Sequence, residues 1–248
     1  MSVNVIDYRQ SHTGRTKGQQ YDRRFQSFAW RKYLWEQERA VLLDILGKYF
    51  TEAPLHYLDF ACGTGRIIEF MHDKVAHATG VDISGSMLKE CVPKVPSAEI
   101  IHGDITRENV LGDRKFDIIT AFRFFPNAQR ELREEAMRAL RTHLCENGLV
   151  VLNNHRNASS ILFRSIALLR AGVPTMHDRE VIALVGKIGL SIDRVYSIGL
   201  LPGYDNNPMI LPRFVHAAAD RCANALRCGR HLCQDNIYVC RKVERNLS

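Results

Sequence analysis

The chain has 248 residues, enough for one large α/β domain and too few for two complete ones. Hydrophobic residues make up 46% of it and charged residues 25%, as in an ordinary globular protein. No apolar run approaches the roughly 18 residues that a membrane-spanning helix needs, and the first residues lack the pattern of a secretory signal. We therefore expect a cytoplasmic protein.

Positive charge is concentrated near the amino terminus. The net charge is +7 and the isoelectric point is about 9.1. Such a basic arm is typical of proteins that bind nucleic acid, an anionic membrane or an acidic substrate, and equally of a plain solvated surface. The first 33 residues contain only two acidic residues, Asp7 and Asp22. The seven basic residues of this arm are Arg9, Arg15, Lys17, Arg23, Arg24, Arg31 and Lys32.

The seven cysteines are an odd number in a chain without a secretory signal, so we expect free thiols. One cluster combines Cys222, Cys228, His231 and Cys233, but its spacing matches no common zinc site. We predict no metal there, and a helix with partly buried thiols instead.

The first 50 residues differ in pattern from the rest. Residues 1–20 are polar, and we expect them to be loose. From Tyr21 to Ile45, aromatic and aliphatic residues recur at helical spacing, which predicts one or two amphipathic helices ending near Lys48. The predicted division is a loose arm and helical lid over residues 1–50 and the main domain over residues 51–248.

Strand-like and helical patterns then alternate, which predicts a parallel sheet with helices on both faces. Ser84 is the expected N-cap of one helix, and Leu132, Ala136, Leu140 and Leu144 form the apolar stripe of another. The expected strands are 56–61, 78–83, 98–105, 116–125 and 148–155, and the expected helices are 64–74, 84–91 and 129–145.

After Ser159 the alternation is less regular. We expect a helix from Asp178, as its cap, to Gly189, and a loop at 201–208. Because only about 35 residues separate the last two strands, one of them is expected to lie antiparallel at the sheet edge. These two strands are predicted at 190–199 and 235–243, with a helix over 210–227 between them.

The stretch LDFACGTGR, residues 58–66, turns from the first strand into a helix. Its glycines allow a ligand close to the backbone, and amides at a helix start favour negative charge. Asp82, ending the second strand, could accept both ribose hydroxyls of a nucleoside, and Asp104, ending the third, could accept an exocyclic amino proton. Ile68 stands where a dinucleotide fingerprint has its third glycine, which disfavours NAD.

These motifs, in this order, resemble the class I S-adenosylmethionine-dependent methyltransferases of the small Rossmann-like type. The resemblance runs from Leu55 to Val243 and rests on LDFACGTG, GVDISGSML, IHGDI, FDIITAFRFF and LRTHLCENGLVVLNNH. It implies S-adenosyl-L-methionine as cofactor and a Rossmann-like methyltransferase fold of the α/β class. In that fold a seven-stranded, mostly parallel sheet has helices on both faces and an antiparallel edge strand.

The resemblance also implies roles for single residues. Asp59 would set the first loop, whose residues 61–65 would lie against the methionine portion, and Ala61 replaces a frequent glycine. Ile83 and Met87 would flank the adenine, or be ordinary core residues. The implied cofactor-binding residues are Tyr21, Arg31, Asp59, Ala61, Cys62, Gly63, Thr64, Gly65, Asp82, Ile83, Met87, Asp104, Ile105, Phe122 and Arg123.

The chemistry asks mainly for in-line positioning of a nucleophile near the methyl group, with a base where the acceptor is protonated. His155 is the candidate base, since an unperturbed pKa near 6.5 suits it, although it could simply pack in a loop. Arg123 and Arg156 could hold a carboxylate, phosphate or anionic sugar, or pair with local acids. His102 is expected to be exposed or to act only through its neighbours.

The sequence disfavours some classes of methyl acceptor but does not name the acceptor. The fourth strand lacks the Asn/Asp-Pro-Pro-aromatic turn of amine-modifying relatives, and no cysteine pair for attack on pyrimidines is present at the strand ends. We expect methyl transfer to a small molecule or biosynthetic intermediate, an anionic or sugar-bearing one among them, with loop 201–208 walling the acceptor site. The alternatives are an RNA methyltransferase, an NAD-type oxidoreductase and a non-catalytic cofactor-binding protein.

Overall fold

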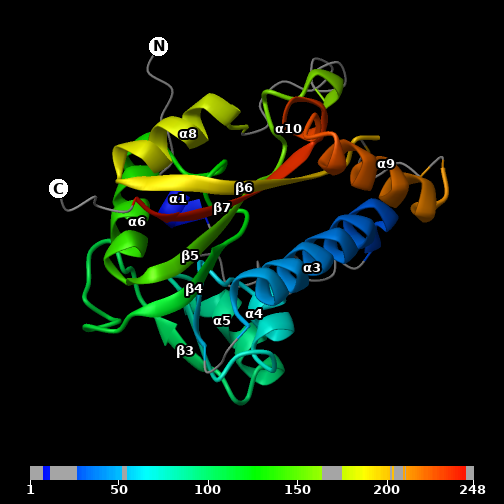
Figure 1. The fold of residues 1–248 in the computed structure, drawn as a ribbon. Coiled ribbons are helices and arrows are strands. Elements are labelled where there is room, and N and C mark those ends of the chain that lie inside the picture. Colours follow the sequence, from blue (N-terminus) through cyan, green and yellow to red (C-terminus); the bar gives the residue numbers. More distant parts are fainter. Residues whose placement is uncertain are drawn as a thin grey trace, which may run out of the picture.

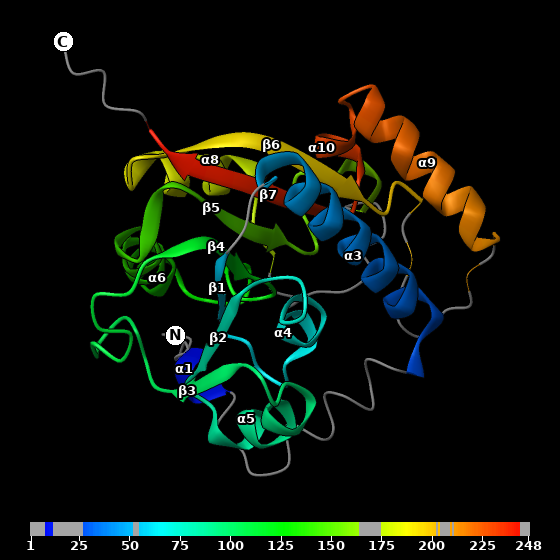
Figure 2. The ribbon, with the colours of Figure 1, turned by 60° about the horizontal axis from the view of Figure 1, so that its bottom comes forward.

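The computed structural model describes residues 8–11, 27–51, 55–163, 175–201, 203, 209 and 211–243. Its centre is a seven-stranded sheet in the order β3-β2-β1-β4-β5-β7-β6 (Figure 1, Figure 2). The strands are β1 (His56–Phe60), β2 (His77–Asp82), β3 (Glu99–His102), β4 (Phe116–Ala121), β5 (Leu144–Asn154), β6 (Leu190–Ile198) and β7 (Asp235–Lys242).

The expected sheet is confirmed. The five strands β1 to β5 pair in parallel, and β7 pairs antiparallel with both β5 and β6. The reversed strand β7 is therefore one place in from the edge, and β6 is the edge strand that pairs antiparallel with it. The strand order reverses between β1 and β4, which is where open α/β sheets bind ligands, beyond the carboxyl ends of the strands.

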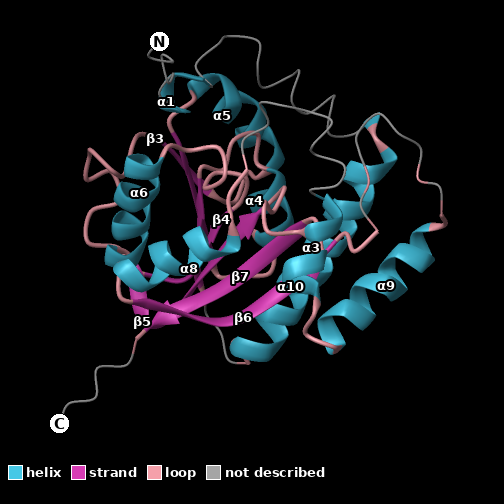
Figure 3. Cartoon of the chain, turned by 90° about the horizontal axis from the view of Figure 1, so that it is seen from above, coloured by secondary structure: helices cyan, strands magenta, loops and turns pink. Residues whose placement is uncertain are grey.

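Helices cover both faces of this sheet, as Figure 3 shows from above. Alternate residues of a strand face opposite sides, so Leu58 packs in one core with Leu132 and Val181, while Tyr57 packs in the other with Leu42 and Ile68. The helices are α1 (Tyr8–Ser11), α3 (Ala29–Tyr49), α4 (Arg66–Met71), α5 (Gly85–Cys91), the 3₁₀ turn η1 (Val92–Lys94), α6 (Arg130–Thr142), α8 (Asp178–Lys187), α9 (Arg213–Ala225) and α10 (Gly229–Leu232).

Three details at element ends differ from the expectations. The helix predicted over 129–145 ends at Thr142, and Leu144 instead begins β5, where it pairs with Phe116. Asp178 is the first residue of α8 rather than its cap, because its carboxylate is taken by residues of α10 and β7. Ser84 does hold the N-cap position of α5, yet its side chain makes no capping hydrogen bond.

The long helix α3, predicted from the first 50 residues, is part of the core. Along α3, Trp30, Tyr33, Leu42 and Ile45 are buried in the cluster that covers one face of the sheet. The short helix α1 was not predicted from the polar residues 1–20. Several residues of the expected arm and of the expected wall loop lie outside the described residues: Arg15, Lys17, Tyr21, Asp22, Arg23, Arg24 and most of 201–208.

The seven cysteines are unpaired in the structure. In the predicted thiol cluster, Cys233 is buried, whereas Cys222 and Cys228 are exposed. Over the described ranges, no group of His, Cys, Asp or Glu side chains is placed to hold a metal ion. Over the same ranges, no helix has the length and apolarity that crossing a bilayer requires.

Candidate active site

A cavity of about 510 Å³ lies beyond the carboxyl ends of β1, β2, β4 and β5, within the size range of small-molecule sites. It brings together most of the predicted residues. Gly65 and Ile105 do not line it, and Tyr21 is not among the described residues. The predicted residues that line the cavity are Arg31, Asp59, Ala61, Cys62, Gly63, Thr64, Asp82, Ile83, Met87, Asp104, Phe122, Arg123 and His155.

The loop after β1 has three left-handed residues: Ala61 at φ 54°, Gly63 at 57° and Gly65 at 89°. Gly65 is needed for packing rather than for a ligand, because a Cβ there would lie 2.6 Å from the sulfur of Cys91. Ala61 has its Cβ in this conformation, at a cost of about 1–3 kcal/mol. That strain gives a physical reason for the glycine that is frequent at this position.

Two aspartates, Asp59 buried and Asp82 partly buried, fix this loop. Asp59 accepts hydrogen bonds from the Ile68 amide (3.1 Å) and the Thr120 hydroxyl (2.8 Å), and burial raises its pKa to about 7. Asp82 accepts from the amides of Gly63 and Ser84, both at 2.8 Å, and burial raises its pKa as well. Asp82 therefore ties the loop after β1 to the loop after β2.

The far end of the cavity is closed by α1. Asp104 accepts hydrogen bonds from the Thr106 amide (2.9 Å) and hydroxyl (2.6 Å), and from Arg9 Nε (2.8 Å). Although burial would raise the pKa of Asp104, these bonds from Thr106 and Arg9 hold it below its usual value. Tyr8, beside Arg9, packs edge-on against Phe124 with ring centres 5.7 Å apart. Sequence reasoning treated Arg9 only as part of a basic arm and missed this contact.

His102 lies outside the cavity, as expected. It is exposed, and its Nε2 lies 3.0 Å from the carbonyl oxygen of Ile83.

The opposite end of the cavity is formed by the turns after β4 and β5. Arg123 and Arg156 sit there at φ 59° and 60°, conformations that are costly for residues with a Cβ. Buried side chains hold both backbones in place. Asn153 Oδ1 accepts the Arg123 amide at 2.6 Å, and Asp235 Oδ1 accepts the Arg156 amide at 3.0 Å.

A buried carboxylate on α3 balances part of this positive charge. Glu38, only 2% exposed, forms ion pairs with Arg66 and, at 3.8 Å, with Arg123, and it accepts from Asn153 Nδ2 at 3.3 Å. Sequence reasoning missed Glu38. The available signal was its place four residues after Leu34 and four before Leu42, on the apolar stripe of the predicted helix.

His155 lines the cavity but differs chemically from the expectation. The ring is buried, and Nε2 lies 2.7 Å from an Arg156 guanidinium nitrogen. Burial, and then the charges of Arg123, Arg156, Arg66 and Arg31, lower its pKa well below 6.5. The pKa of His155 is therefore lower than the unperturbed value expected for it, which favours the neutral imidazole, and its role as the base stays a prediction.

Asp235 is a second cavity residue that sequence reasoning missed. Because β7 runs antiparallel, its first residue lies at the carboxyl ends of the other strands, next to the end of β5. Burial raises the pKa of Asp235 to about 6, against the lowering effect of Arg123 and Arg156. The predicted reversal of one late strand was the signal that could have pointed to it.

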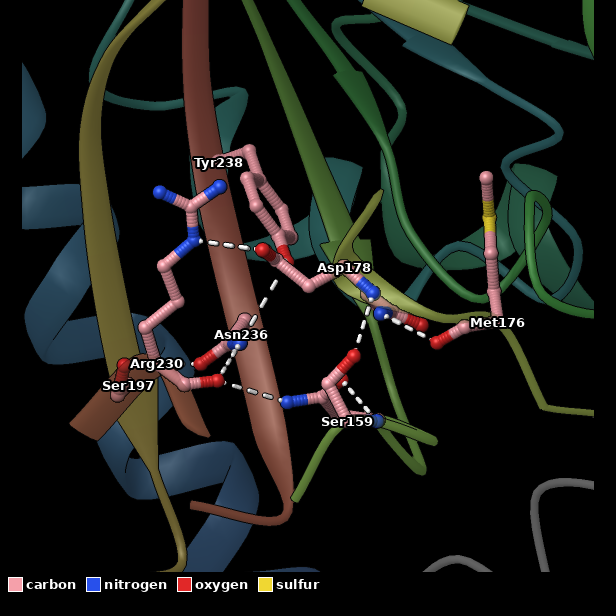
Figure 4. A network of polar contacts seen from close by, with 9 residues as sticks. Ser159, Met176, Asp178, Ser197, Arg230, Asn236 and Tyr238 are labelled. Carbon is pink, nitrogen blue, oxygen red and sulfur yellow. Dashed lines mark hydrogen bonds and ion pairs between the residues drawn. The ribbon is translucent and has the colours of Figure 1, made fainter. Parts of the chain in front are cut away.

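A buried polar network, shown in Figure 4, anchors the turn after β5. Asp178 accepts from Arg230 Nε at 2.8 Å and from the Tyr238 hydroxyl at 2.6 Å. The Arg230 carbonyl in turn accepts from Asn157 Nδ2 and Asn236 Nδ2, both at 2.9 Å. The turn that carries His155 and Arg156 is thus tied to α8, α10 and β7.

One described residue of the predicted wall loop does line the cavity. Gly203 packs so closely on Trp30 that a Cβ would lie 2.5 Å from the indole ring.

Comparison with known proteins agrees with this arrangement. Residues 58–148 match the methyltransferase domain family. A curated relative from Saccharopolyspora spinosa, dTDP-4-amino-2,3,4,6-tetradeoxy-D-glucose N,N-dimethyltransferase, is 30% identical over 120 residues. That match covers 48% of this chain and 47% of the relative, so the chain spans about half of the relative's length.

Solved structures share the fold over nearly the whole chain. Magnesium protoporphyrin IX methyltransferase from Synechocystis, solved with bound S-adenosylmethionine, has a TM-score of 0.63 at 13% identity, covering 98% of this chain and 100% of that one. A possible histamine N-methyltransferase from Thermotoga maritima has a TM-score of 0.61 at 14% identity, covering 91% and 95%. The chain thus carries a match to the methyltransferase domain and has the fold of class I S-adenosylmethionine-dependent methyltransferases.

Proposed function

We propose that this protein transfers a methyl group from S-adenosyl-L-methionine to a small-molecule or biosynthetic-intermediate acceptor. The observation that carries the proposal is that one cavity joins two chemically distinct ends. One end combines residues 61–64 of the loop after β1 with the carboxylates of Asp82 and Asp104, and the other is lined by Arg123, His155 and Arg156. The relative from Saccharopolyspora spinosa, named for an amino-sugar acceptor, supports a small molecule.

The residues present fit this cofactor. A carboxylate oxygen can accept more than one hydrogen bond, so Asp82 and Asp104 can still receive ribose hydroxyls and an adenine amine. Met87 and Ile83 line the same cavity and would flank the adenine ring. Arg31 lines the same cavity and would pair with the methionine carboxylate. When bound, the cofactor supplies an electrophilic methyl group on a sulfonium.

The chain's own task is then to hold the acceptor in line and to exclude water. Phe28 and Trp30, at the start of α3, line the cavity from one side, and Tyr8 and Arg9 close it from the other. These contacts support the expected lid. Location in the cytoplasm stays a prediction from the sequence.

A thermal-shift series tests the proposal. A ligand present at about 100 times its Kd adds roughly 2.7 kcal/mol, which in a protein of this size raises Tm by about 5–10 °C. We expect that shift with S-adenosylhomocysteine, none with NADH, and its loss in Asp82→Ala. Asp113→Ala, at an exposed position, serves as the matched control. A shift with NADH alone, or none with S-adenosylhomocysteine, would contradict the proposal.

A further inference from the structure

Asp235 is a buried carboxylate that uses only one of its two oxygens. The residue is 3% exposed and lines the cavity. Its Oδ1 accepts the Arg156 amide at 3.0 Å, whereas Oδ2 accepts no hydrogen bond, and the carboxylate forms no ion pair, within the part of the chain that the structure describes. Buried carboxylates are normally paired or hydrogen-bonded. Oδ2 is therefore suited to a donor that the protein itself does not supply.

This oxygen is open to the cavity. Some polar side-chain atoms are completely enclosed and lack a partner, such as His155 Nδ1 and Trp30 Nε1, but Asp235 Oδ2 is not one of them. Because Asp235 lines the cavity and is otherwise buried, the accessible side of Oδ2 is the cavity side. A ligand group in the cavity can reach it.

The place of Asp235 in the sheet points to the methyl acceptor rather than to the cofactor. The strand order β1-β4-β5-β7 puts β7 three strands away from β1, roughly 14 Å at the usual strand spacing. The loop after β1 and Asp82 at the end of β2 form the proposed cofactor end, on the other side of β4. A group bound at Asp235 therefore lies over β5 and β7, beyond the reach of the nucleoside.

The carboxylate is also held in a fixed place. Asp235 begins β7, where it pairs with Ile198 of β6, and the next residue, Asn236, pairs with Asn154 of β5. In the network of Figure 4, Asn236 Nδ2 donates to the Arg230 carbonyl at 2.9 Å. A group that is fixed before the ligand arrives loses little conformational freedom on binding.

We infer that Asp235 Oδ2 accepts a hydrogen bond from the nucleophilic amine or hydroxyl group of the methyl acceptor. The inference rests on the proposed function and deepens it, because it names an N–H or O–H nucleophile as the acceptor class. A carboxylate as the methylated group is disfavoured, since a second anion would then lie against Asp235.

Ligand-observed NMR with three small probes tests this contact. Methylammonium supplies N–H donors, phenol supplies an O–H donor and acetate supplies neither, and each is titrated near neutral pH into protein saturated with S-adenosylhomocysteine. We expect methylammonium or phenol to bind more tightly than acetate, and its affinity to fall by roughly tenfold or more in Asp235→Asn. The tighter of the two donors distinguishes an amine from a hydroxyl acceptor.

The variant is chosen to leave the turn intact, because the amide oxygen of asparagine can still accept the Arg156 N–H. Asp113→Asn, at an exposed position, is the matched control and should bind all three probes as the wild type does.

The pH dependence separates contact with the ligand from a merely structural role. Burial raises the pKa of Asp235 to about 6, and both donor probes keep their protonation state around that pH. Affinity in the wild type should therefore fall about tenfold from about pH 7 to about pH 5, as the carboxylate is protonated, and stay constant in Asp235→Asn. The wild-type curve decides even where the variant does not fold. The charged and titratable groups that face Asp235 are Arg123, Arg156, His155, Glu38 and Cys233.

The outcomes separate the two proposals. Equal affinity in the wild type and Asp235→Asn, no binding of either donor probe, or tighter binding of acetate overturns the contact. Donor probes that bind only without S-adenosylhomocysteine also overturn it, because Asp235 would then hold the cofactor's own amino group. If S-adenosylhomocysteine does not bind but a donor probe follows the predicted variant and pH pattern, the proposed function fails and the donor-binding role of Asp235 stands.

Discussion

The two ends of the cavity are built in opposite ways. The proposed cofactor end is acidic, and its groups follow three neighbouring strands: Asp59 on β1, Asp82 on β2 and Asp104 after β3. The other end is basic, and its groups come from α3, the turns after β4 and β5, and the reversed strand β7. The first end depends on short local motifs, whereas the second exists only once distant segments have packed together.

The largest effect is expected at the cofactor end, from Gly65→Ala. Its φ of 89° is costly for alanine, and the new Cβ would meet Cys91 at 2.6 Å from the sulfur and 3.3 Å from Cα. Strain and overpacking together should cost about 3–4 kcal/mol, seen as a Tm lower by about 6–16 °C.

Gly47→Ala is the control for that variant. Gly47 is inside α3 with no described atom within 4 Å of a new Cβ, so alanine should raise stability by up to about 1 kcal/mol. Equal effects of the two substitutions would show that the left-handed corner is not constrained as described.

At the basic end, Glu38→Gln should be nearly as damaging. It leaves Arg66 and Arg123 partly buried without their carboxylate, a loss of about 3 kcal/mol in urea unfolding. Glu36→Gln, on the same helix, removes an exposed pair with Arg213 and should cost less than about 1 kcal/mol. Similar losses of stability in the two variants would show that Glu38 does not stabilise the fold through its ion pairs with Arg66 and Arg123.

Asp235 gives the basic end its own pH dependence. Its pKa in the folded protein is about 6, above the ordinary 3.8, so the folded state holds this proton more tightly than the unfolded chain. The resulting stability is present below about pH 4 and is lost as the pH rises through about 6. Facing groups in the fold are Arg123, Arg156, His155, Glu38 and Cys233.

Relative to Asp235→Asn, the wild type should therefore lose up to about 3 kcal/mol of stability between about pH 4 and 7. Urea unfolding of both proteins across that range measures the difference in their free energies of unfolding. Asp59, whose pKa is raised to about 7, is present in both proteins, so its contribution cancels in that difference. Parallel curves would mean that Asp235 titrates normally in the folded protein.

The smallest effect concerns α1. In Arg9→Ala, the link from Arg9 to Asp104 and Thr106 is lost, and S-adenosylhomocysteine should dissociate about 3–10 times faster, equivalent to about 1 kcal/mol. Arg107→Ala, an exposed neighbour of the same loop, should leave the rate unchanged. Stopped-flow displacement measures both dissociation rates. Equal rates in the wild type and the two variants would show that α1 does not close the cavity over the ligand.

The sequence was enough to predict the strands, because the short continuous runs of buried residues in β1 and β5, bounded by turn residues, are a local property of the sequence. It was also enough to group Asp82 with the glycine loop, since the ends of parallel strands meet at one edge. Leu144 was misassigned because an apolar residue fits both the stripe of α6 and the start of β5. Glu38, Asp235 and Arg9 were missed because their partners lie 28 to 126 residues away in the sequence, beyond any local pattern.

The most direct test of the central claim, that the acidic end of the cavity holds S-adenosyl-L-methionine, is a crystal structure with S-adenosylhomocysteine. We predict the ribose hydroxyls on Asp82, the adenine amine on Asp104 and the methionine portion along residues 61–65. S-adenosylhomocysteine bound outside this cavity, or bound with its adenine among Arg123 and Arg156, would contradict the proposed function.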